Sequence, residues 1–177
     1  MFNQSILDFF KRHNLYEENM FEYIYDHCDM IDYYVDEDAR ICIGCSYAID
    51  KKTKKLLRFR ICIPYPIDDK TMLMAIHEIV HGIVGYKFLG RRFDLGIAVE
   101  ALPMLYERIY VSEHPTEELI AFANKLDNTI KPYSDPSYRF GYLVRHELYN
   151  KYEPNYHKMD KLVRKMAKDF ERKEKQN

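Results

Sequence analysis

The stretch Thr71-Met-Leu-Met-Ala-Ile-His-Glu-Ile-Val-His-Gly82 decides how this chain is interpreted. Its composition and apolar spacing predict a helix. His77 and His81 are four residues apart, so both imidazoles project from one face of that helix, one turn apart. Glu78 lies to the side of this pair, where a carboxylate can accept a proton from water. Two neutral nitrogen ligands beside such a base predict a catalytic metal site.

Two histidines leave a zinc site short of one protein ligand. A third histidine one turn further along is excluded because Gly85 occupies that position, and the longer H-E-x-x-H-x-x-G-x-x-H pattern finds no histidine either. The remaining common solution is a glutamate from a following helix. Glu100 comes after 18 intervening residues beyond His81, which allows a loop to reverse the chain. Glu107 lies two helical turns after Glu100, where it could hydrogen-bond a ligating histidine or remain a solvated carboxylate.

Pro103 restricts where the helix that carries Glu100 can begin. Proline is tolerated in the first turn of a helix, but it costs about 3 kcal/mol in the interior. This helix is therefore expected to start near Val99 or to bend at the proline.

These residues resemble the gluzincin zinc metallopeptidases. The pattern His77-Glu-Ile-Val-His81, then Glu100, then Glu107 is similar to the aminopeptidase N-type pattern H-E-x-x-H-x18-E with a second glutamate seven residues on. The short chain also looks like the compact minigluzincins. Ser137-Tyr-Arg-Phe-Gly-Tyr-Leu-Val144 is similar to the Y-x-x-G-x-x-x-[VL] segment of that group, whose tyrosine hydroxyl stabilises the oxyanion.

The resemblance covers about residues 57–150, and it implies a single zincin-like metallopeptidase domain over residues 1–177. It implies Zn2+ as cofactor, with His77, His81 and Glu100 as metal ligands, Glu78 and Tyr138 as catalytic residues, and Glu107 in support. The substrate would be a peptide or protein. Tyr142 and His146 adjoin Tyr138 and are alternative oxyanion donors. The chain lacks the G-x-M-E-N strand that holds a free amino terminus in the aminopeptidases, so cleavage of chain ends or of internal bonds stays open.

A different class of function is also compatible with the pattern, namely a catalytically silent or latent peptidase-like module that binds a metal or a partner. A purely structural site needs neither a general base nor an oxyanion donor. Glu78 and Tyr138 therefore favour the enzyme.

The remaining patterns predict an α+β fold, mostly helical and zincin-like, with a small sheet. Alternating apolar residues predict a β-hairpin over residues 40–63, with Leu57, Phe59, Ile61 and Ile63 on its apolar face and a solvated lysine-rich tip at residues 50–55.

Residues 2–28 are expected to form two helices that break near Asn14, and residues 30–38 are ambiguous. Further helices are predicted at residues 115–126, around Tyr138, and at about residues 156–176, where an amphipathic helix packs on the core. Asp68 or Asp69 should cap the H-E-x-x-H helix, and Gly82 and Gly85 should mark its end.

Composition limits the other function classes. A net charge of −1 argues against nucleic-acid binding. The sequence shows no apolar run that approaches about 18 residues, and we find no signal peptide in it. We therefore expect no membrane partner and a cytoplasmic location.

The four cysteines include Cys42-Ile-Gly-Cys45, but a zinc knuckle needs a second pair. We therefore expect reduced, packed thiols.

Overall fold

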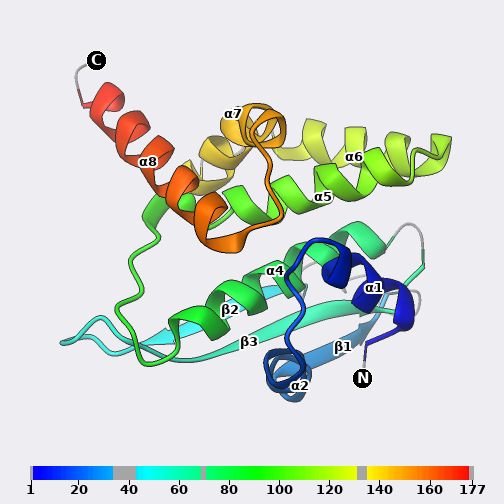
Figure 1. Ribbon diagram of the computed structural model, residues 1–177, viewed down its shortest axis with the longest axis horizontal. Helices are drawn as coiled ribbons and strands as arrows, with labels where there is room; N and C mark the ends of the chain where they lie inside the picture. Colours follow the sequence, from blue (N-terminus) through cyan, green and yellow to red (C-terminus); the bar gives the residue numbers. More distant parts are fainter. Residues whose placement is uncertain (1, 34–42, 69–70, 131–134, 176–177) are drawn as a thin grey trace. The chain divides into compact units, whose positions relative to one another are not determined.

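A computed structural model of the chain describes residues 2–33, 43–68, 71–130 and 135–175. Within these residues, seven α-helices and one three-stranded mixed sheet confirm the predicted α+β class (Figure 1). The chain divides into two compact units, residues 1–94 and residues 95–177. The first unit contains the sheet, and the elements of the second are helices. A single zincin-like domain stays a prediction.

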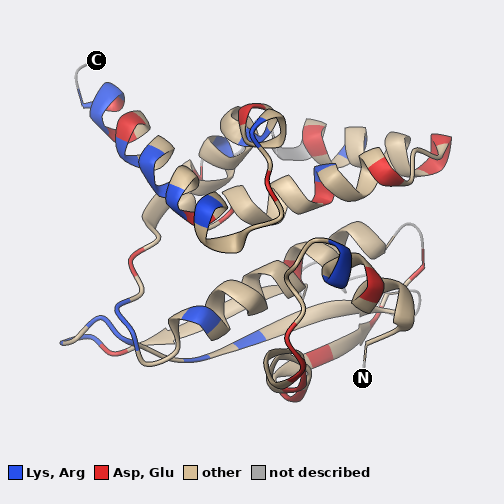
Figure 2. Ribbon diagram, viewed as in Figure 1, with Lys and Arg blue, Asp and Glu red and all other residues tan. Residues whose placement is uncertain are grey.

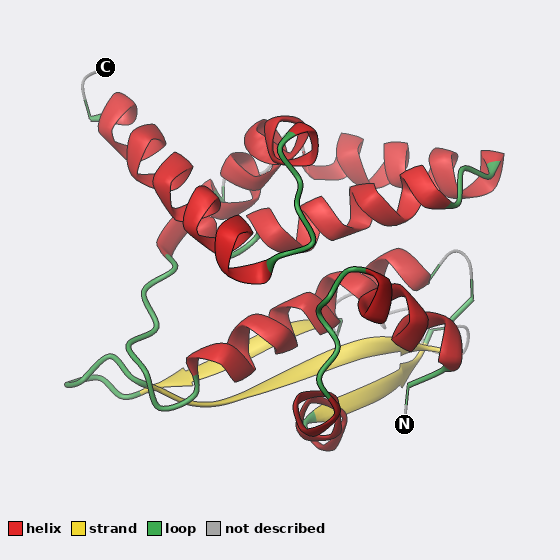
Figure 3. Ribbon diagram, in the orientation of Figure 1, coloured by secondary structure: helices red, strands yellow, loops and turns green. Residues whose placement is uncertain are grey.

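The first unit is a small sheet with the H-E-x-x-H helix running along it (Figure 3). The strand order is β1-β3-β2, with β1 parallel and β2 antiparallel to the central β3. On β3, alternate side chains are buried beneath α4 while the arginines between them are exposed. The elements are α1 (Gln4–Arg12), α2 (Glu18–Asp26), β1 (Cys28–Asp32), β2 (Gly44–Ile49), β3 (Leu56–Tyr65) and α4 (Met72–Phe88).

The hairpin is confirmed, but one residue of its apolar face was assigned wrongly. Phe59, Ile61 and Ile63 are buried as predicted, whereas Leu57 is 62% exposed and Leu56 is fully buried instead. A shift in the pairing register between Ala48 and Ile49 causes this change. Such a bulge inserts one residue into a strand and reverses the facing of the side chains beyond it.

The two N-terminal helices are confirmed, with a break at Asn14, whose φ of 54° lies in the left-handed region. The ambiguous segment begins inside β1, which runs from Cys28, the last residue of the predicted helical range, to Asp32. The rest of that segment, and residues 40–42 of the predicted hairpin, lie outside the described residues. Figure 2 shows the basic residues of the hairpin tip in blue. Residues 51–55 are exposed, as expected for a solvated turn. Asp50 Oδ1 accepts a hydrogen bond from the Thr53 amide at 2.6 Å and closes this turn.

The H-E-x-x-H helix, α4, is longer than predicted. Asp68 caps its start as expected, because Asp68 Oδ1 accepts from the Thr71 amide at 2.9 Å; Asp69 lies outside the described residues. The prediction that Gly82 and Gly85 end the helix is wrong, since α4 continues to Phe88. Both glycines instead allow close packing: a Cβ at Gly85 would lie 2.6 Å from the Phe59 ring. A side chain at position 85 has no room, which gives a physical reason for the absence of a third histidine there.

The second unit consists of η1 (Gly96–Ala98), α5 (Ala101–Glu113), α6 (Glu117–Ile130), α7 (Pro136–Asn150) and α8 (Tyr156–Glu174). Helix α5 begins at Ala101, so Pro103 falls in its first turn and breaks no helical hydrogen bond. The start is therefore close to the predicted one near Val99. Helix α7 packs on both α5 and η1. The predicted C-terminal amphipathic helix is α8, and its inward face buries Tyr156, Met159, Val163 and Ala167.

Candidate metal centre

The first two candidate ligands lie on α4, inside the first unit. His77 and His81 are buried, with 8% and 4% of their surface exposed. Their Nε2 atoms lie 3.1 Å apart. Two nitrogens that each bind a tetrahedral zinc ion at about 2.0–2.1 Å are separated by about 3.3 Å. The two imidazoles therefore already have nearly the separation that one shared cation requires.

Glu78 follows His77 on α4 and is also buried, at 7% exposed. The pKa of Cys62 on β3 is raised by burial, by the carboxylate of Asp29 and, to a smaller extent, by the charge of Glu78. Its burial on α4 places the Glu78 carboxylate inside the unit, on a helix that packs against the sheet, rather than in bulk solvent. A carboxylate in a low-dielectric environment interacts more strongly with a nearby cation or proton donor than one in water.

Glu100 is the residue that immediately precedes α5 in the second unit. Its backbone carbonyl accepts the first helical hydrogen bond, from the Met104 amide at 3.1 Å, and its side chain is 7% exposed. Gly141 on α7 lies directly against it: a Cβ at that position would be 3.3 Å from the carbonyl carbon and oxygen of Glu100 and 2.6 Å from Met104 Sδ. The glycine therefore lets α7 press on the backbone that carries this glutamate.

The three predicted ligands form one group. Ligand atoms of His77, His81 and Glu100 all lie within 4.8 Å of one another, and all three residues are buried. Among the residues with described positions, this is the one set of three or more His, Cys, Asp or Glu side chains gathered in this way. The group could hold a metal ion, as the sequence predicted.

The other predicted site residues lie on α5 and α7. Tyr138 is half-buried in the first turn of α7, three residues before Gly141. Glu107 is half-buried on α5. The roles of Tyr138 at an oxyanion and of Glu107 beside a ligating histidine stay predictions.

The two alternative oxyanion donors also lie on α7. The Tyr142 ring is covered by the guanidinium of Arg145 at 4.4 Å, and Arg145 in turn donates to Asp127 Oδ2 at 2.6 Å. His146 is exposed, and its Nδ1 accepts from Arg108 at 3.3 Å.

Sequence reasoning missed a residue of the site, Tyr47 on β2. Its hydroxyl donates to the backbone carbonyl of His81 at 3.0 Å and lies 3.3 Å from His81 Nδ1. The available signal was weak. In the sequence, Tyr47 is one of several apolar residues that alternate with polar or small residues along the first hairpin strand. Its contact with a residue 34 positions further on depends on how the strand packs against α4.

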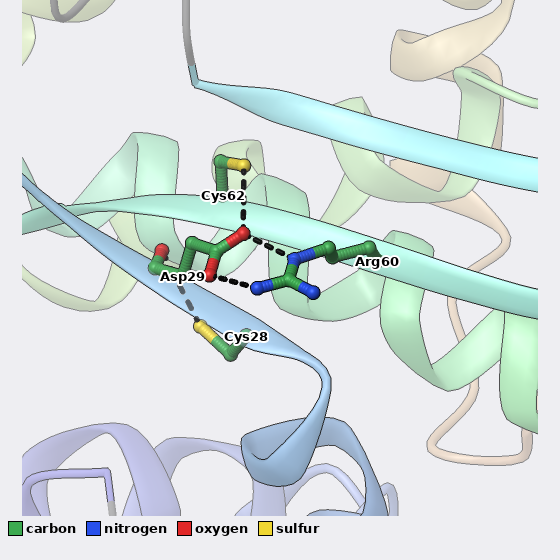
Figure 4. A network of polar contacts seen from close by, with 4 residues as sticks. All are labelled: Cys28, Asp29, Arg60 and Cys62. Atoms are coloured by element: carbon green, nitrogen blue, oxygen red, sulfur yellow. Dashed lines mark hydrogen bonds and ion pairs between the residues drawn. The ribbon is translucent and has the colours of Figure 1, made fainter.

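The described cysteines form no second metal site. Figure 4 shows Asp29 on β1 beside Cys28 and Cys62; its carboxylate forms an ion pair with Arg60, and Cys62 Sγ lies 3.8 Å from Asp29 Oδ2. Burial, together with the nearby Asp29 charge, raises the pKa of Cys28 to about 12. Because the thiolate is the form that attacks electrophiles and binds metals, these thiols are suited to neither role. Among the described residues, Cys28, Cys45 and Cys62 are half-buried thiols that form no disulfide; Cys42, and with it the C-x-x-C pair, lies outside the described residues.

The comparisons with known proteins assign the chain to no family. No family model, curated protein or solved structure matches the chain. Within the described residues, no helix has the length and apolar character needed to cross a membrane.

Proposed function

We propose that this chain is a zinc-dependent metallopeptidase of the gluzincin type. The observation that carries the proposal is the buried group of His77, His81 and Glu100, with Glu78 beside His77 on the same helix. Two imidazoles and one carboxylate are the donor set of hydrolytic zinc sites that keep a fourth position open. Magnesium and calcium, in contrast, prefer sites made of oxygen atoms alone.

The protein residues have distinct roles in the proposed reaction. Zinc, when bound, acts as a Lewis acid and lowers the pKa of water to about 7. Glu78 takes a proton from the attacking water and later transfers it to the leaving amine. Tyr138 donates a hydrogen bond to the oxyanion that develops on the substrate carbonyl, an interaction worth about 3 kcal/mol in comparable sites.

The hairpin offers a place for the substrate. In the described strand order β3 is central, and β2 is the hairpin strand at the end of the order. Tyr47 on β2 contacts His81, so β2 is the strand beside the two histidines. An extended peptide would pair with β2 through main-chain hydrogen bonds, as peptides do when they add a strand to a sheet.

The proposal is tested by measuring zinc per chain and cleavage of a broad peptide library for the wild type and three variants. Glu78→Gln should keep zinc and lose cleavage, because it removes the base but no ligand. Glu100→Ala should lower zinc occupancy. Glu117→Ala removes an exposed carboxylate on α6 and should change neither quantity.

Two outcomes would oppose the proposal. Full zinc occupancy in Glu100→Ala would refute the assignment of that ligand. Zinc binding without cleavage by the wild type would favour the second candidate function, a metal-binding module without turnover.

A further inference from the structure

We infer that Tyr47 is a positioning residue that fixes the tautomer of His81 and so presents its Nε2 atom to the metal. The inference deepens the proposed function and rests on its assignment of His81 as a ligand. It depends on two short contacts of one hydroxyl group, both within the first unit.

The protonation of His81 follows from the number of hydrogens on the Tyr47 hydroxyl. A tyrosine oxygen carries one hydrogen and can also accept. The backbone carbonyl of His81 can only accept, so the hydroxyl hydrogen of Tyr47 is donated to it at 3.0 Å. The remaining contact, 3.3 Å from the Tyr47 oxygen to His81 Nδ1, must then be a hydrogen bond donated by Nδ1. His81 therefore carries its proton on Nδ1, an assignment that follows from the hydrogen-bond network.

This protonation has a direct consequence for the other ring nitrogen. A neutral imidazole with its proton on Nδ1 has a lone pair on Nε2. His81 Nε2 faces His77 Nε2 at 3.1 Å, the position where a shared cation would bind. Histidines that bind metals commonly have their second nitrogen held by a carboxylate, a carbonyl or water. In this chain the Tyr47 hydroxyl holds the second nitrogen of His81, Nδ1.

Other residues hold Tyr47 in place. Its ring packs on Phe93, with centroids 4.5 Å apart, and Phe93 also packs against Phe88, with centroids 5.6 Å apart. The loop that carries Phe93 is tied to the hairpin, because the Phe93 amide donates to the carbonyl of Lys54 at 2.9 Å. These contacts direct the Tyr47 hydroxyl towards His81.

The first test uses the metal-free protein and requires no activity. Long-range 1H–15N correlation spectra of the imidazoles, recorded near pH 8 where histidine is neutral, report which nitrogen of His81 is protonated. We expect the Nδ1–H form in the wild type and a mixture of both tautomers in Tyr47→Phe. A wild-type His81 protonated on Nε2 would overturn the inference.

The second test measures zinc affinity by competition with a chelator. Tyr47→Phe keeps the ring on Phe93 and removes only the hydroxyl, and it should weaken zinc binding by about 10- to 100-fold. Tyr86→Phe is the matched control: it deletes a half-buried hydroxyl on α4 and should leave the affinity unchanged. Equal affinities of the wild type and Tyr47→Phe would refute a positioning role.

Failure of this inference and failure of the proposed function are distinguishable. The tautomer and the zinc affinity are both read without substrate. If Glu78→Gln still cleaves peptides, the proposed mechanism fails while the role of Tyr47 stands. If Tyr47→Phe binds zinc normally and cleavage still requires Glu78, the role of Tyr47 fails while the proposed mechanism stands.

Discussion

The substitution Gly85→Ala tests whether α4 is held against the sheet by close packing. In a helix interior, alanine is more favourable than glycine by about 1 kcal/mol. The new Cβ, however, would lie 2.6 Å from Phe59 Cδ1 and 2.8 Å from Cγ. Carbon atoms prefer separations of about 3.5–4.0 Å, so the ring would have to move by about 1 Å.

Phe59 has little room to move. It is 2% exposed, and its ring packs against Tyr23 at 5.6 Å and His27 at 6.2 Å. Overpacking of this kind destabilises a core by about 1–3 kcal/mol. After the gain in helix propensity of about 1 kcal/mol is subtracted, we expect Gly85→Ala to lower the free energy of unfolding by up to about 2 kcal/mol.

Gly82→Ala is the matched control in the same helix. Its Cβ would lie 3.0 Å from Ile24 Cγ2, the nearest atom, so a shift of a few tenths of an ångström relieves the contact. The propensity gain of about 1 kcal/mol is the same and the packing cost is smaller, so Gly82→Ala should be at least as stable as the wild type. Urea unfolding followed by circular dichroism measures both variants. If Gly85→Ala is as stable as Gly82→Ala, the argument from packing at Phe59 is refuted.

Three further predictions concern separate sites. Gly141→Ala should weaken zinc binding, because its Cβ would press on the Glu100 backbone at 3.3 Å; an unchanged dissociation constant in chelator competition would oppose this. Cys28 should react with iodoacetamide about a thousandfold more slowly in the folded chain than in urea, since burial raises its pKa from 9.0 to about 12; mass spectrometry gives both rates, and equal rates would contradict the burial argument. The hydrogen bonds from Arg60 lower the pKa of Asp29, so this pair should stabilise the fold above the unfolded pKa of about 3.9 and lose that effect as the pH falls towards the lower, folded value. Asp29→Asn should flatten this part of the stability curve, and coinciding curves would refute the contribution.

Much of the fold was predictable because its signals are local. The spacing of His77 and His81 is a property of any helix, and Pro103 limits a helix start wherever it occurs. Burial of Phe59, Ile61 and Ile63 follows from the two-residue period of a strand. These features need no knowledge of which elements meet.

The errors arose where distant segments meet. The bulge at Ala48 and Ile49 turns Leu57 outward, and simple alternation does not reveal a register shift. Gly85 resembles a helix end in sequence, but its function is to admit the Phe59 ring. Tyr47 is one of 16 tyrosines, and only the packing of β2 on α4 selects it.

The Tyr47 hydroxyl also links two local equilibria. It joins the hairpin to α4 at the residue that would hold a metal, so separation of β2 from the helix and loss of the ligand geometry become one opening event. A ligand that binds only the closed form opposes opening by RT ln(1 + [L]/Kd), about 2.7 kcal/mol at a hundred times the dissociation constant. Amide hydrogens of the hairpin should therefore exchange with solvent about a hundredfold more slowly once zinc is bound, while those of the remote helix α1 change less. Hydrogen exchange in the hairpin would thus report metal occupancy at a distance from the ion.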